Sequence, residues 1–164
     1  MTWNETIENF SHFLKFERNF SDNTLDAYIR DVKKLKAFSE EKLDNTTPDK
    51  ITFENLQEFL LYLTKEKISE RTQARGISSI KSFFKYLIEE EIREDNPSTL
   101  LEGPKLGLYL PDTLSFEDVE KIIKAIDLST DLGVRNHCII EVLYGCGLRV
   151  SELIELKISD VNFK

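Results

Sequence analysis

The first ninety or so residues contain four segments in which a helix-start signal is followed by apolar side chains at helical spacing. In "TWNE", residues 2–5, a threonine stands three residues before a glutamate, which is the pattern of a capping box. Further start signals stand at "SDNT", residues 21–24, at Thr52 and at Ser69, and none of these segments alternates like a strand. The sequence therefore predicts a mainly α fold that begins with a four-helix bundle over residues 1–92.

Residues 93–113, "REDNPSTLLEGPKLGLYLPDT", hold three of the four prolines and two glycines, and they show no helical period. A stretch of this length without secondary structure is uncommon inside one compact domain. We therefore predict an interdomain linker here, between a helical domain of residues 1–92 and a second domain that begins at residue 114.

Residues 114–164 predict three more helices, the last a short one after Arg149, and the beginning of a strand. Ser115 and Asp118 form another capping pattern. A helix from about Leu132 is apolar almost all round through "CIIEVLY", which predicts that it is buried. The last residues, "KISDVNFK", are typical of the first residues of a strand. We expect this segment to be the helical N-terminal part of a longer α+β domain.

Composition limits the partners and the compartment. The 164 residues carry a formal net charge of −8, which on average argues against a phosphate-bearing partner, although the distribution of charge decides binding. The two cysteines, Cys138 and Cys146, stand in apolar segments, so we expect core thiols and neither a disulfide nor a metal site. The N-terminus is unlike a signal peptide, and no apolar run approaches the roughly 20 residues that span a bilayer. These features predict a cytoplasmic protein with no membrane partner.

Basic charge is concentrated in the fourth predicted helix. Between Ser69 and Lys85 there are four basic residues and one acidic residue, a local net charge of +3. One face of this helix carries basic and hydroxyl side chains at steps of four and three, and the opposite face is apolar. Such a stripe suits phosphate contacts and close approach to a groove, whereas a solvated helix face explains most charge runs. The stripe consists of Arg71, Arg75, Ser78, Ser82 and Lys85.

The second predicted helix adds a smaller set of polar candidates. Arg30 and Lys34 lie away from its apolar stripe, and we expect Asn23 and Thr24 to be the polar caps that open it. These four residues extend the candidate nucleic-acid surface.

Arg149 stands in "YGCGLRVSELIEL", directly after a glycine turn and at the predicted start of a short amphipathic helix. A helix N-terminus offers unpaired N–H groups and a partial positive charge, and an arginine there adds a planar fork that matches two phosphate oxygens. Glu152, one turn later, is placed to pair with the guanidinium. An exposed arginine in an ordinary salt bridge is the alternative interpretation.

The segment "LYGCGLRVSELIELKISDV" resembles the first catalytic arginine segment of the tyrosine site-specific recombinases, whose pattern is approximately L-Y-x-x-G-L-R-x-S-E-L. Two more segments, "NFSDNTLDAYIRDVKKLKAF" and "RTQARGISSIKSFFKYLIEEEIREDNPSTLLEGPKLGLYLP", are similar to the second helix and to the fourth helix with linker of the Xer branch, and of its XerD group in particular. The resemblance covers essentially the whole chain.

The resemblance implies a SAM-like core-binding domain and a catalytic domain that together clamp double-stranded DNA, with the second and fourth helices toward the major groove. It implies metal-free, cofactor-free transesterification through a covalent phosphotyrosine, in which Arg149 stabilises charge on the phosphate and Glu152 supports it. It also implies chromosome-dimer resolution at cell division by a tetramer, formed with a XerC-like paralogue or with further copies of the same protein.

The family also requires a hairpin lysine, a His-x-x-Arg pair, a further His or Trp and a nucleophilic tyrosine, and this sequence provides none of them at a matching position. We therefore expect these 164 residues to be a monomeric fragment that binds DNA without cleaving it. Two alternatives stay open, a short non-catalytic DNA-binding regulator and a helical protein–protein interaction module. The tyrosines, none of which is assigned as the nucleophile, are Tyr28, Tyr62, Tyr86, Tyr109 and Tyr144.

Overall fold

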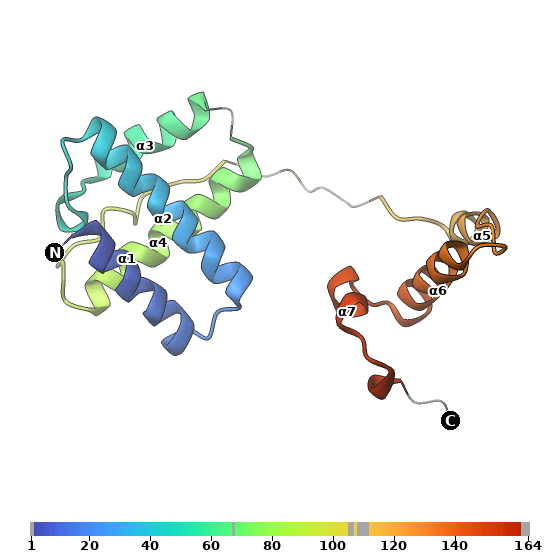
Figure 1. Cartoon of the computed structure of the whole chain (residues 1–164). Helices are drawn as coiled ribbons and strands as arrows, with labels where there is room; N and C mark the ends of the chain where they lie inside the picture. Colours follow the sequence, from blue (N-terminus) through green and yellow to red (C-terminus); the bar gives the residue numbers. More distant parts are fainter. Residues whose placement is uncertain (1, 67, 105–106, 108–111, 162–164) are drawn as a thin grey trace. The chain divides into compact units, whose positions relative to one another are not determined.

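Four α-helices form the first of two units in this computed structural model, which describes residues 2–66, 68–104, 107 and 112–161. The units are Met1–Leu108 and Tyr109–Lys164 (Figure 1). A π-helical turn and a short 3-10 turn accompany the helices of the first unit. In chain order its elements are α1 (Trp3–His12), η1 (Phe13–Glu17), α2 (Asp22–Lys42), η2 (Pro48–Lys50), α3 (Phe53–Lys65) and α4 (Glu70–Glu89).

Each helix of the first unit begins at a predicted start signal. Thr2 and Glu5 form a capping box at α1, and Thr52 with Asn55 does the same at α3. Ser69 accepts a hydrogen bond from the backbone N–H of Thr72 at α4. These side chains satisfy N–H groups that the first turn of a helix leaves unpaired, which is why short polar residues at these positions fix the boundaries.

Aromatic side chains fill the core of the first unit. Phe83 is fully buried on α4, and its ring centroid lies 5.2 Å from that of Phe10 and 6.0 Å from that of Trp3. The indole Nε1 of Trp3 donates to the carbonyl oxygen of Thr46 at 2.8 Å, which ties α1 to the loop after α2. In Figure 1, α2 lies across α4, and the two helices pack against each other.

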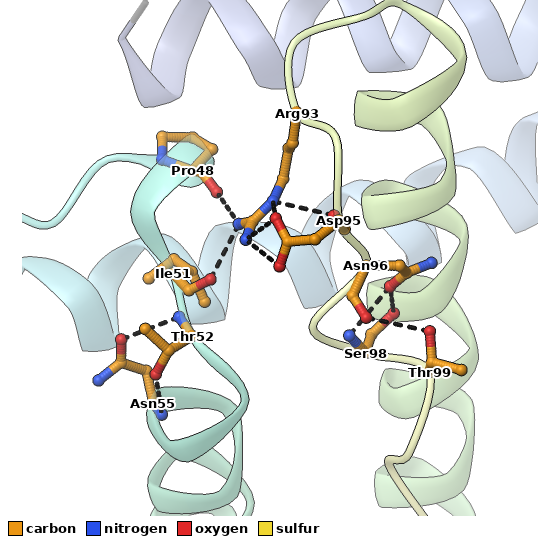
Figure 2. Close-up of polar contacts among 9 residues, drawn as sticks. All are labelled: Pro48, Ile51, Thr52, Asn55, Arg93, Asp95, Asn96, Ser98 and Thr99. Atoms are coloured by element: carbon orange, nitrogen blue, oxygen red, sulfur yellow. Dashed lines mark hydrogen bonds and ion pairs between the residues drawn. The ribbon is translucent and has the colours of Figure 1, made fainter.

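The start of the predicted linker packs on the first unit. Figure 2 shows Arg93 reaching the carbonyl oxygens of Pro48 and Ile51, to which its Nη1 donates at 3.1 and 2.8 Å. The Arg93 side chain is only 7% exposed, and Asp95 pairs with it at 2.9 Å. Leu101 is buried further along. Residues 93–101 are therefore held on the helical unit, and the predicted boundaries at 92, 93–113 and 114 stay a prediction.

The second unit consists of short helices with little core. Its elements are α5 (Phe116–Lys124), α6 (Asp131–Cys146), α7 (Val150–Glu155) and the 3-10 turn η3 (Ile158–Asp160). The capping box of Ser115 and Asp118 is present at α5. Among the described residues of this unit, Val119 is the one that is buried.

Two sequence-based expectations for the second unit are wrong. Among the described residues, none of α6 is buried, and Cys138 and Cys146 are exposed. The contacts of α6 with the short helices α5 and α7 leave its apolar stretch from Cys138 to Tyr144 incompletely covered. Residues 158–160 form a turn instead of a strand. The Asp160 carboxylate accepts from the Lys157 backbone N–H at 3.1 Å and closes this turn. Residues 162–164 of the predicted strand lie outside the described residues.

Among the residues that the structure describes, no helix combines the length and the apolar character needed to cross a membrane.

Candidate nucleic-acid interface

The predicted basic stripe of α4 lies on the surface of the first unit. Arg71, Ser78 and Lys85 are exposed, and Arg75 and Ser82 are half-buried. The opposite face packs into the core, as the sequence predicts, through Ile77, Ile80, Phe84 and Leu87. The stripe is therefore accessible to a large ligand, although its members differ in how much of each side chain reaches solvent.

Arg75 is not an isolated surface cation, because Asp31 of α2 holds it. The Nε of Arg75 donates to Oδ2 of Asp31 at 3.0 Å, and its Nη2 donates to Oδ1 at 3.2 Å. The Asp31 side chain is 3% exposed, whereas that of Arg75 is 39% exposed. The hydrogen bonds from Arg75 to Asp31 raise the pKa of the guanidinium, which stays charged at every physiological pH.

Two more side chains converge on the same carboxylate. The Ser79 hydroxyl donates to Oδ2 of Asp31 at 3.1 Å, and the Lys34 ammonium lies 3.7 Å from Oδ1. Asp31 thus joins α2 to α4 and touches two of the predicted DNA-contacting cations. The sequence pattern alone does not single out Asp31. The available signal was its position beside the apolar stripe of α2, directly before the buried Val32.

The remaining α2 candidates lie near its first turns. Arg30 and Asn23 are exposed, and Thr24 is half-buried. The expectation that Asn23 and Thr24 cap the helix is wrong, because Ser21 is the N-cap and accepts from the Thr24 backbone N–H. The Ser21 and Thr24 hydroxyls are also hydrogen-bonded at 2.9 Å. Ser21 precedes the helix with its backbone in the β region, and its short side chain carries a hydroxyl acceptor. Both features are typical of an N-cap residue.

Arg18 and Lys81 are further cations that the sequence did not single out. They line a pocket of about 350 Å³ together with Ser82 and Lys85. Glu89 also lines it and accepts from Nη2 of Arg18 at 2.8 and 3.0 Å. Arg18 comes from the segment after η1 and is 71 residues from Glu89 in the chain, so helical spacing alone gives no sign of this cluster.

Arg149 occupies the N-cap position of α7 in the second unit. Gly147, two residues earlier, has φ +65°, a left-handed conformation that favours glycine, and it ends α6. The Arg149 backbone N–H donates to Glu152 at 2.7 Å, and its Nη1 donates to the other carboxylate oxygen at 2.9 Å. The Arg149 side chain is 82% exposed.

The contacts with Arg149 lower the pKa of the Glu152 carboxyl group. The hydrogen bond from the Arg149 backbone N–H is the main cause that lowers the pKa of Glu152, and the guanidinium contributes as well. The Glu152 side chain thus remains ionised and holds the arginine beside the first turn of α7. The structure brings the two predicted residues together as the sequence pattern predicts; the role of each in chemistry stays a prediction.

Comparison with known proteins gives the class of each unit. The phage integrase N-terminal SAM-like domain matches residues 7–91, and the phage integrase family matches residues 112–164. The first unit thus contains a SAM-like helical domain of the integrase type, and the second unit matches the phage integrase family. The chain belongs to the phage integrase family.

Curated relatives confirm the resemblance to the Xer tyrosine recombinases. Tyrosine recombinase XerD of Oceanobacillus iheyensis is 43% identical over 156 residues, which cover 95% of this chain and 52% of that relative. Tyrosine recombinase XerD of Listeria innocua is 37% identical, with 98% of this chain and 54% of that relative covered. The chain therefore spans about half the length of the curated relatives it matches.

Solved structures agree on the fold. The Tn1549 transposon integrase, solved in complex with circular intermediate DNA, matches with a TM-score of 0.65 at 19% sequence identity. The match covers 97% of this chain and 51% of the integrase chain. The crystal structure of XerA recombinase has a TM-score of 0.50 at 30% identity and covers 98% of this chain and 52% of its own. The first of these likenesses concerns the fold alone.

Proposed function

We propose that the chain consists of the DNA-binding helical domain of a site-specific tyrosine recombinase and the segment that carries its first catalytic arginine, Arg149. The observation that carries the proposal is the match of both units to the phage integrase family, in the order that a recombinase requires. In this proposal a helical domain of residues 1–92 binds double-stranded DNA, residues 93–113 form the interdomain linker, and residues 114–164 begin the catalytic domain.

The proposed DNA surface combines exposed and half-buried side chains of α2 and α4. Cations on neighbouring helices contact phosphates and fix the register of the protein on the duplex, while hydroxyl groups permit close approach to base edges. The surface consists of Arg71, Arg75, Ser78, Ser82, Lys85, Arg30, Lys34, Asn23 and Thr24. Because the whole chain has a net charge of −8, binding depends on this local concentration of positive charge.

Arg149 is proposed to meet the scissile phosphate. In the proposed reaction a tyrosine oxygen attacks phosphorus, the phosphorus–oxygen bond to the departing strand breaks, and the strand leaves as a hydroxyl after gaining a proton. The charge that develops on the non-bridging oxygens is stabilised by an arginine already aimed at them. Glu152 leaves the second edge of the guanidinium available, since its carboxylate takes a single side-chain bond from Nη1.

The proposed assembly is the one that the Xer resemblance implies. Recombination at two DNA sites would involve four subunits, with a XerC-like paralogue or further copies of the same protein as partners. Chromosome-dimer resolution at cell division is the proposed biological process. The nucleophilic tyrosine is not assigned to any residue of these 164, so we expect the chain alone to bind duplex DNA and not to cleave it.

A salt titration tests the proposed DNA surface. A labelled 30-bp duplex of random sequence should bind, with an affinity that falls steeply as salt rises. Arg71→Glu combined with Arg75→Glu should weaken this binding at least tenfold, because two cations of the proposed surface are replaced by negative charges that repel the DNA phosphates. Lys42→Glu combined with Lys50→Glu is the matched control, since both lysines are exposed outside the proposed surface. Equal affinity of all three proteins would contradict the placement, and absence of binding would favour a protein–protein interaction module.

A suicide-substrate assay tests the expected lack of cleavage. A nicked duplex that traps covalent protein–DNA adducts should give none with these 164 residues. Any adduct would show that one of the tyrosines present acts as a nucleophile.

A further inference from the structure

The carboxylate of Asp31 is the most enclosed charged group at the proposed DNA surface. Its side chain is 3% exposed, yet one of its partners, Arg75, is 39% exposed. A buried carboxylate is retained at a cost in desolvation unless its oxygens are well satisfied. Here both oxygens are satisfied by α4, through Arg75 and Ser79, and Lys34 of α2 lies beside them.

The bonds to Asp31 use only one edge of the Arg75 guanidinium. The group has five N–H donors, and the carboxylate takes one from Nε and one from Nη2. Among the described residues, Nη1 has no hydrogen-bond partner. Three donors therefore remain, and those on Nη1 and Nη2 form a second fork along the other edge. A fork of this kind matches two acceptors of a guanine edge or two oxygens of a phosphate.

We infer that Asp31 is a positioning residue, which holds Arg75 so that its second fork reads a base edge in the proposed DNA-bound state. The inference rests on the proposed function. A long arginine side chain in solvent loses much rotamer freedom when it binds, whereas one held beforehand by a buried acceptor loses less. Ser79 adds to the effect, because its hydroxyl fixes the Oδ2 oxygen that receives Nε of Arg75.

A purely electrostatic role for Asp31 and a positioning role predict different effects of removing its charge. Asp31 places a negative charge next to two cations of a DNA-binding surface, so its neutralisation should strengthen binding to every duplex equally. Positioning predicts a split result instead. Loss of the carboxylate should leave binding to unrelated sequence intact or slightly stronger, and should reduce the preference for the selected sequence.

The test uses the 164-residue chain and two duplexes. One duplex is enriched by the wild-type chain from a randomised 20-bp pool, and the other is its shuffled counterpart. Asp31→Asn keeps the shape of the side chain and one acceptor oxygen. It should lower the ratio of affinities for the two duplexes about tenfold, the range expected for one bidentate base contact. Glu40→Gln is the matched control, because it removes the same charge from an exposed position of α2 and should leave the ratio unchanged.

A double-mutant cycle separates positioning from stability. Arg75→Lys keeps the charge and loses the fork, so it should lower the ratio to a similar extent, and the double variant should show no further loss. If Asp31→Asn does not fold, Arg75→Lys still decides, since a ratio unchanged from wild type would overturn the inference.

Each remaining outcome has a distinct meaning. A folded Asp31→Asn variant with the wild-type ratio, or with equal losses for both duplexes, overturns the inference. Equal affinity of the wild-type chain for the two duplexes overturns it as well and leaves the proposed function standing. Absence of any salt-dependent duplex binding by the wild-type chain overturns the proposed function, and the inference with it.

Discussion

Arg149 combines an exposed charge with a restrained position. The Glu152 carboxylate holds both the backbone N–H and the guanidinium of this residue, so the side chain stays beside the first turn of α7 although it is 82% exposed. Arg75 in the first unit shows the same principle with a buried partner, Asp31. In both cases an acidic side chain decides where a cation lies before any ligand arrives, which lowers the entropy that binding would cost.

The pair at α7 predicts a pH dependence. Hydrogen bonds from Arg149 lower the pKa of Glu152, so its carboxyl should titrate below its ordinary value of 4.5. A lowered folded pKa means that the stabilising contribution is complete above the unfolded pKa and is lost as pH falls through the folded one. A ¹³C NMR titration of the Glu152 carboxyl measures this. Arg149→Ala should restore only part of the shift, because the backbone N–H still donates. A midpoint at or above 4.5 in the wild type would contradict the assignment.

The core of the first unit predicts a large single-residue effect. Phe83 is fully buried and contacts the rings of Phe10 and Trp3, so Phe83→Ala should lower the free energy of unfolding by about 3–5 kcal/mol. Urea unfolding followed by circular dichroism gives the value. Leu61→Ala is the control, since Leu61 is 63% exposed on α3, and it should cost less than about 1 kcal/mol. Similar losses in the two variants would show that Phe83 is not central.

Helix boundaries are the part of the fold that the sequence predicted best, because capping is local. At each N-cap a short side chain accepts a hydrogen bond from a backbone N–H of the first turn, so four consecutive residues contain the whole interaction. These N-cap residues are Thr2, Thr52, Ser69 and Ser115. The burial predicted for α6 failed because burial depends on which elements come to cover a helix. Asp31 was missed for a related reason, since Arg75 lies 44 residues away along the chain.

Two glycines of α6 predict opposite effects of the same substitution. A Cβ at Gly133 would overlap the carbonyl oxygen of Asp127, so Gly133→Ala should displace the turn before α6 and weaken its first turn. A Cβ at Gly145 would meet nothing within 4 Å, so Gly145→Ala should stabilise the helix by about 0.5–1 kcal/mol.

Hydrogen exchange of the α6 amides distinguishes the two variants. Protection should fall in the Gly133→Ala variant, first at the N-terminal end of the helix, and should rise in Gly145→Ala. Equal protection in both would mean that the turn around Asp127 adapts at no cost.

At the scale of the whole molecule, core and candidate chemistry are divided between the units. Nearly all buried apolar residues belong to the first unit, and Val119 is the one buried residue described in the second. The proposed DNA surface lies on the well-packed unit, while Arg149 lies on the unit with little core. Net charge of the chain predicted neither location, because a value of −8 averages over a surface that concentrates positive charge on α4.

The packing of residues 93–101 on the first unit gives a prediction about where that unit ends. A protein of residues 1–104 should fold by itself, because it contains the aromatic core and the segment that covers it. A protein of residues 1–92 should be less stable by about 2–4 kcal/mol, since it loses the buried Leu101 and the Arg93 hydrogen bonds to Pro48 and Ile51.

Urea midpoints of the two proteins at equal m-value test this difference. The Arg93→Ala variant of residues 1–104 isolates the contribution of the guanidinium. Its removal leaves the carbonyl oxygens of Pro48 and Ile51 without their donor and should account for about 1–3 kcal/mol of the loss. The remainder belongs to apolar burial around Leu101 and should persist in that variant. Equal midpoints for residues 1–92 and 1–104 would place the end of the helical domain at residue 92 and make the contacts of Arg93 a surface feature without energetic weight.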